Sequence, residues 1–112
     1  MAAKAILVAK PNSFHFEDRA LDLSSSVRIG RSHKEDKSSS GNAIFDCKVL
    51  SRNHAVIMAE EGKFFIMDTG SSNGTFVNNI RLSKCGEESK VTEIYSGDSL
   101  RYLYGFYYLC RH

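Results

Sequence analysis

The sequence predicts an all-β fold, a two-sheet β-sandwich of short, mostly antiparallel strands. Its apolar residues alternate with polar ones or form short continuous runs, and helical spacing is almost absent. Gly, Ser, Asn and Asp interrupt these runs at short intervals, as turns between strands do. The chain of 112 residues is long enough for a single domain, residues 1–112, with its own core.

Residues 1–68 contain six expected strands. Residues 4–9 form an apolar run that is too short for a signal peptide and suits a first strand. Further strands are expected at residues 21–23, 27–29, 43–46, 55–58 and 64–68. Residues 59–63 are expected to connect the last two as a hairpin. The long polar segment 32–42 is expected to be a mobile loop and not a linker between domains.

The second half continues in the same pattern. Residues 75–77 and 81–82 are expected to be strands joined by a tight turn at Asn78-Asn79. Three more strands are expected at residues 91–94, 99–102 and 106–110. The last two predict a short final hairpin.

Composition excludes several classes of function. No segment is long enough to cross a bilayer, and a net charge of +2 is too small to indicate nucleic-acid or membrane binding. Three cysteines without a Cys-x-x-Cys spacing predict free thiols in a reducing compartment, and therefore a cytoplasmic protein. The four histidines show no ligand spacing with Cys or Asp, so no metal or cofactor is expected.

Three polar blocks lie where strands are expected to begin or end. Gly30-Arg31 ends one strand, residues 51–54 (Ser-Arg-Asn-His) precede another, and residues 71–78 precede and contain a third. The Arg guanidinium presents a planar, charged fork that matches phosphate oxygens, and the other blocks add hydroxyls and an amide. A sandwich holds its loop ends rigidly, so blocks far apart in sequence can meet at one edge. The pattern predicts a site for one phosphate.

The order and spacing of these blocks, followed by Ser96-Gly97-Asp98 and an apolar strand, resemble the forkhead-associated (FHA) family of phosphothreonine-binding domains. The resemblance extends over nearly the whole chain. It implies peptide binding without catalysis or cofactor. The phosphopeptide contacts that it implies are Arg31, Ser51, Arg52, Ser72 and Asn73.

The resemblance also implies residues that support the site and residues that select its ligand. Gly30 is expected in a tight turn, His54 in a buried hydrogen bond that links loops, and Gly74 in another turn. The family usually has an aromatic residue followed directly by Gly near the end, whereas this chain continues through residues 100–105 and abbreviates the following loop. The candidate selectivity residues are Lys48, Leu50, Tyr104 and Gly105.

Residues 45–55 are similar to a narrower group of FHA domains, which stand at the N-terminus of longer proteins. Members of that group continue into coiled coil and a C-terminal membrane anchor, and they work in striatin-based phosphatase–kinase assemblies (STRIPAK). Their FHA domain recruits a threonine-autophosphorylated kinase of the Hippo type. The resemblance therefore implies an N-terminal signalling module with such a kinase as partner.

Three other functions are compatible with parts of the sequence. Ser51 and His54 suggest a nucleophile and a base, although no orienting acid or oxyanion element is evident. Arg and hydroxyl clusters also fit the phosphates of a nucleic-acid backbone. A phosphate-independent scaffold would present the tyrosines at 102, 104 and 107, which are more simply explained as strand residues.

Overall fold

A computed structural model describes residues 3–9, 16–33, 37–101 and 107–111. The strands of this structure are β1 (Lys4–Ala9), β2 (Arg19–Asp22), β3 (Val27–Arg31), β4 (Ala43–Phe45), β5 (Ala55–Glu60), β6 (Lys63–Asp68), β7 (Phe76–Val77), β8 (Ile80–Arg81), β9 (Thr92–Ile94), β10 (Ser99–Arg101) and β11 (Tyr107–Arg111). Each corresponds to one strand that the sequence predicted. Their ends differ from the expected ones by at most two residues, apart from positions 102 and 106, which lie outside the described residues.

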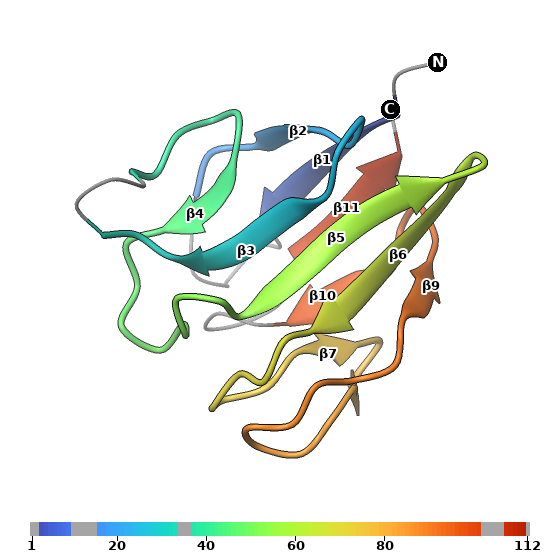
Figure 1. Cartoon of the computed structure of the whole chain (residues 1–112). Coiled ribbons are helices and arrows are strands. Elements are labelled where there is room, and N and C mark those ends of the chain that lie inside the picture. Colours follow the sequence, from blue (N-terminus) through green and yellow to red (C-terminus); the bar gives the residue numbers. More distant parts are fainter. Residues whose placement is uncertain (1–2, 10–15, 34–36, 102–106, 112) are drawn as a thin grey trace.

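The strands form two sheets packed face to face (Figure 1). One sheet has six strands in the order β2-β1-β11-β10-β7-β8, and the other has five in the order β4-β3-β5-β6-β9. Among the registered pairs only β3 and β4 run parallel, with Ile29 opposite Ala43. The predicted sandwich of mostly antiparallel strands is confirmed.

Strand alternation explains the core between the sheets. Successive side chains of a strand point to opposite faces, so every second residue is buried. In β5 and β6 the inward residues Ile57 and Ile66 are fully buried, and Leu7 and Leu100 of the other sheet belong to the same buried core. Complete burial of one such side chain contributes about 1.5–3 kcal/mol.

Two turns show how local sequence ends the strands. The β7–β8 turn places Asn78 and Asn79 at φ 49° and 70°, a left-handed backbone that Asn tolerates, which confirms the predicted turn. The β5–β6 hairpin is tighter than expected. Ala59 and Glu60 stay paired with β6, so only Glu61 and Gly62, at φ 51° and 76°, form the turn.

The strand directions bring the three polar blocks to one end of the sandwich. Because β3, β5 and β6 are antiparallel neighbours, the end of β3 lies beside the start of β5 and the end of β6. In Figure 1 this is the lower end of the five-stranded sheet. Arg31, the loop of residues 46–54 and the loop of residues 69–75 therefore lie together.

A buried arginine anchors residues 37–42 of the long polar segment. Arg19 is 7% exposed, and its Nη1 donates to the carbonyls of Ser39 at 2.7 Å and Ile44 at 2.9 Å. Its guanidinium also lies 4.2 Å from the centre of the Phe45 ring. Residues 37–42 are thus tied to the sandwich by hydrogen bonds, and the mobility expected for the segment 32–42 stays a prediction.

The described residues contain no helix with the length and apolar character needed to cross a membrane. Of their cysteines, Cys47 is buried, Cys85 is exposed, and both are free thiols.

Candidate functional site

Ser51 is the centre of a group of hydrogen bonds that joins the three polar blocks. Its carbonyl accepts the Arg31 N–H at 3.1 Å, and its Oγ accepts the Ser72 N–H at 3.2 Å. The Asn73 side-chain amide donates to the carbonyl of Val49 at 2.8 Å, in the same loop as Ser51. The structure therefore brings together Arg31, Ser51, Ser72 and Asn73, which the sequence pattern placed in one site.

The Arg31 guanidinium and the hydroxyls of Ser51 and Ser72 remain open to a ligand. Arg31 is the last residue of β3 and is half-buried, and no other described residue hydrogen-bonds or ion-pairs with its guanidinium. The Ser51 hydroxyl accepts one bond, so its own O–H is free to donate onward. Ser72 and Asn73 are exposed beside it. A guanidinium, two hydroxyls and an amide at one loop cluster can bind a phosphate and the backbone around it.

His54 links two of the loops from below. It is fully buried; its Nδ1 accepts the Ser51 main-chain N–H at 3.2 Å, and its Nε2 lies 2.8 Å from the Gly74 carbonyl. The two partners require the neutral tautomer that carries its hydrogen on Nε2. Because Nδ1 takes the main-chain N–H and not the hydroxyl of Ser51, the pair is not arranged as base and nucleophile.

Asp68 and Ser71 support the site but were not identified from the sequence. Asp68 Oδ1 accepts the N–H groups of Gly70 and Ser71, each at 2.8 Å, and its Oδ2 accepts the Ser71 hydroxyl at 2.5 Å. The Ser71 Oγ in turn accepts the Gly74 N–H at 3.1 Å. Burial acts to raise the pKa of Asp68, but hydrogen bonds, led by those of Ser71, lower it below 3.8. The spacing Asp-x-Gly-Ser of an Asx-turn was the available signal.

The two glycines of the site have different roles. Gly74 lies in a turn at φ 93°, a conformation that L side chains rarely adopt. Gly30 is within β3 and not in a tight turn, so that prediction is wrong. A Cβ at position 30 would overlap the carbonyl oxygen of Arg52, and Arg28 Nη1 donates to that same oxygen. Gly30 therefore makes room for the loop that carries Ser51.

The remaining predicted residues are less closely joined to this cluster. The Arg52 side chain is exposed, and only its carbonyl has a described contact in the site. Lys48 is exposed on the same loop. The prediction for Leu50 is wrong, because a turn that hydrogen-bonds the Leu50 N–H to the Cys47 carbonyl directs the side chain into the core, where it is 1% exposed. Tyr104 and Gly105 lie outside the described residues.

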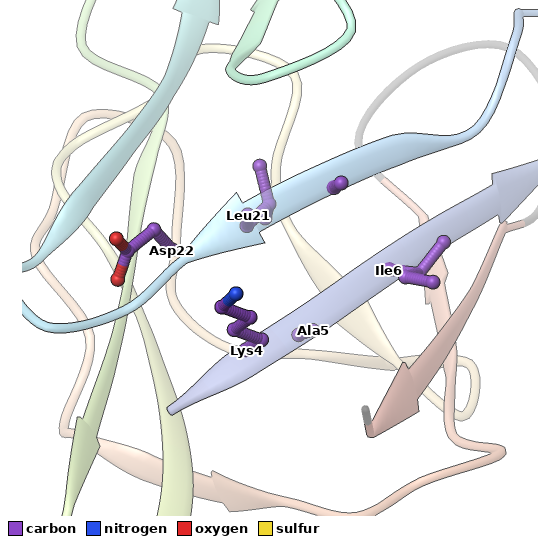
Figure 2. Close-up of a pocket in the computed structure, with 6 residues that line it drawn as sticks. Lys4, Ala5, Ile6, Leu21 and Asp22 are labelled. Atoms are coloured by element: carbon purple, nitrogen blue, oxygen red, sulfur yellow. The ribbon is translucent and has the colours of Figure 1, made fainter. Parts of the chain in front are cut away.

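A separate hollow of about 290 Å³ lies between β1 and β2 (Figure 2). It lies on two strands that carry none of the predicted site residues. Ala20, opposite Ile6 in the strand register, is too short to fill it. Lys4 and Asp22, which are also register partners, place opposite charges at one end. This neutral hollow offers no excess of donors to a phosphate. No group of three or more metal-ligating side chains occurs in the part of the chain that the structure describes.

Buried His54 predicts a loss of stability in mild acid. Burial lowers its pKa below 6.5, although the Gly74 carbonyl and Asp68 oppose the shift. Below about pH 6.5 the His54 imidazole is protonated in the unfolded chain but stays neutral in the folded protein. The free energy of unfolding therefore falls by at most about 1.4 kcal/mol for each pH unit. The Asp68 carboxyl does not contribute to the change in stability between pH 7.5 and 5.5, because its pKa lies below 3.8 and it stays ionised in that range.

Urea denaturation at pH 7.5 and 5.5 measures this loss. The variant His54→Gln cannot titrate at this position, and its stability is expected to depend less on pH than that of the wild type. The same pH dependence in both proteins would show that the acid sensitivity arises elsewhere.

Comparison with known proteins identifies the family. The FHA domain profile matches residues 27–102. Human sarcolemmal membrane-associated protein is 48% identical over 103 residues, which cover 90% of this chain and 12% of that protein. The chain thus corresponds to a small part of the relative's length.

Two solved structures are similar to the whole fold. Mycobacterium tuberculosis EmbR in complex with a low-affinity phosphopeptide has a TM-score of 0.68 and 26% identity, covering 96% of this chain and 24% of EmbR. The FHA domain of MEK1 in complex with a phosphothreonine peptide of HOP1 also has a TM-score of 0.68, at 18% identity, and covers 96% of both chains. The chain belongs to the FHA family, a family of non-catalytic binding modules.

Proposed function

We propose that this domain recognises a phosphothreonine peptide and thereby docks a phosphorylated partner protein. The phosphopeptide-binding residues in this proposal are Arg31, Ser51, Arg52, Ser72 and Asn73. The observation that carries it is the hydrogen bonding around Ser51, which joins the backbones of Arg31 and Ser72 to Ser51, while the Asn73 side chain bonds to the same loop at Val49. Similarity to FHA domains solved with phosphopeptides supports the same ligand.

Each proposed contact has a distinct role. The Arg31 fork pairs with phosphate oxygens, and the hydroxyls of Ser51 and Ser72 donate to the remaining ones. The Asn73 amide oxygen, which no described residue uses, accepts an N–H of the peptide backbone. In this proposal the small cleft for the threonine methyl group lies near Asn73 and Gly74. That methyl is what distinguishes phosphothreonine from phosphoserine.

The expected affinity follows from the charges involved. A phosphothreonine carries about −1.5 to −2 charge and three acceptor oxygens. Each hydrogen bond to a charged group contributes about 1.5–3 kcal/mol. Three or four such bonds, reduced by the ordering of a flexible peptide, leave about −8 kcal/mol, which corresponds to a micromolar complex.

The proposed partner is a threonine-phosphorylated kinase of the Hippo type, within a striatin-based phosphatase complex. This part rests on the similarity to sarcolemmal membrane-associated protein. In the same proposal the chain is the N-terminal module of a longer cytoplasmic protein that is anchored to a membrane by a C-terminal segment outside these residues.

Fluorescence anisotropy with three matched peptide pools tests the proposal. The pools carry phosphothreonine, phosphoserine or unmodified threonine at one fixed position among randomised residues. We expect saturable binding of the phosphothreonine pool alone. Equal binding of all three pools would favour a phosphate-independent scaffold, and binding of a polyanion such as single-stranded DNA instead would favour a nucleic-acid binder.

A further inference from the structure

Two arginines and a phenylalanine form a row across the end of the six-stranded sheet. Phe76 of β7 pairs with Arg81 of β8 on one side and with Arg101 of β10 on the other. The Arg101 guanidinium lies 3.7 Å from the centre of the Phe76 ring, and that of Arg81 lies 5.8 Å from it. Cations are attracted to the ring face, so Phe76 concentrates positive charge in one place.

This row borders the loop that carries Ser72 and Asn73. Arg81 Nη2 lies 3.5 Å from the Ser72 carbonyl oxygen, at the limit of a hydrogen bond. A Cβ added to Gly74 would meet the Arg81 guanidinium at 3.0 Å, so the guanidinium packs directly against that glycine. Ser72 therefore lies between the row and Ser51, whose carbonyl accepts the Arg31 N–H.

The Arg81 side chain is held in place without being neutralised. Its Nε donates to the Ser83 carbonyl at 2.7 Å, which fixes the plane of the guanidinium. The residue is nevertheless exposed, and it forms no ion pair with any carboxylate among the residues whose positions are described. A guanidinium that is already oriented loses little conformational entropy when it binds an anion.

We propose that Arg81 binds a second anionic group of the same phosphopeptide. The proposal rests on the phosphothreonine site proposed above and specifies its ligand: a peptide with a carboxylate or a second phosphate near the phosphothreonine. An extended peptide advances about 3.3–3.6 Å per residue. Since Arg81 contacts the same loop as the first site, the second anion lies only a few residues away.

A peptide scan tests this inference. The parent peptide carries one phosphothreonine among neutral residues, and Glu is placed singly at each of the four positions before and after it. A second series has Gln at the same positions. The measured quantity is the ratio of the two affinities at each position, so any general weakening of a variant cancels. We expect Glu to improve affinity about two- to fivefold at one position in the wild type, as for an exposed ion pair, and less at high salt.

Variants assign that gain to a residue. In Arg81→Gln the ratio of Glu to Gln affinity is expected to fall to about one, and in Arg81→Lys it should be partly retained. Lys63→Gln, at the far end of β6, removes the same charge and should keep the full ratio. Phosphoserine at the favoured position is the second arm: a gain larger than that of Glu identifies a second phosphate as the better ligand, and an equal or smaller gain identifies a carboxylate.

Two results would overturn the inference while leaving phosphothreonine binding intact. One is a wild-type protein that binds the parent peptide but gains nothing from Glu or phosphoserine at any position. The other is a gain that survives in folded Arg81→Gln. A wild-type protein that does not bind the parent peptide refutes the proposed function itself, and this inference with it.

Discussion

Replacing Arg31 by alanine is expected to reduce the affinity for a phosphothreonine peptide at least tenfold, which is about 1.4 kcal/mol, while the domain stays folded. The side chain lies at the end of β3 beside Ser51 and has no polar partner among the described residues, so its removal breaks no described bond. Only its backbone N–H, which the substitution retains, bonds to Ser51. The cost therefore falls on binding and not on stability.

Anisotropy titration and thermal denaturation of the same preparations measure the two effects separately. Arg31→Lys keeps the charge but loses the planar fork, so its affinity should lie between those of the wild type and Arg31→Ala. Lys63→Ala removes one positive charge at the far end of β6 and should bind as the wild type does. A folded Arg31→Ala protein with undiminished affinity would refute the assignment of Arg31 to the phosphopeptide site.

Replacing Gly30 by alanine is expected to damage both the fold and the site. The added Cβ would overlap the Arg52 carbonyl oxygen, which is backbone and cannot rotate away, so the loop of residues 46–54 must shift. Overpacking of this kind costs about 1–3 kcal/mol. The shift also separates Arg28 from the Arg52 carbonyl and moves Ser51 relative to Arg31. We expect a loss of about 2–3 kcal/mol in unfolding free energy and weaker phosphopeptide binding in the folded variant.

The chain offers a matched control in Gly41. A Cβ at that position meets nothing within 4 Å, and its backbone is outside the left-handed region. Gly41→Ala should therefore leave stability unchanged or raise it by about 0.4–1 kcal/mol, through the entropy of the unfolded chain. Urea denaturation of Gly30→Ala and Gly41→Ala measures their unfolding free energies. Peptide titration without urea, where both variants are folded, measures their affinities. Equal stability of the two variants would show that the loop accommodates the Cβ.

The difference between Arg31 and Gly30 separates two kinds of site residue. Arg31 contributes atoms to the ligand, whereas Gly30 and His54 hold the loops in the positions that the ligand requires. Substitution of the first kind should change affinity alone, and substitution of the second kind should change affinity and stability together.

Local patterns were sufficient to predict the strands. Alternation of apolar and polar residues is imposed by the geometry of a strand that packs on one face, so it is visible in short segments such as residues 64–68. Turn residues are similarly local, and Asn78-Asn79 adopts the left-handed backbone that its composition indicated. Where the ends differed, as at Glu60, continued pairing with the neighbouring strand extended the element beyond its apolar residues.

Contacts between distant residues account for what the sequence did not predict. Leu50 has the same apolar composition whether it faces a ligand or the core, and only the turn at Cys47 directs it inward. The role of Gly30 depends on Arg52, and the buried position of Arg19 depends on carbonyls more than 20 positions later, in the segment that it anchors. The Asp68–Ser71 bonds are local, but their importance comes from Gly74 and His54, which join them to the Ser51 loop.

The sequence by itself determined the class of fold, the order of the strands and the types of residue that an FHA site needs, because each of these follows from neighbours along the chain or from motif spacing. The tertiary structure decided which of those residues meet. Ser51 and Ser72 are 21 positions apart and are joined by one hydrogen bond at the end of antiparallel strands. Strand register places these two residues side by side, and register depends on how the whole core packs.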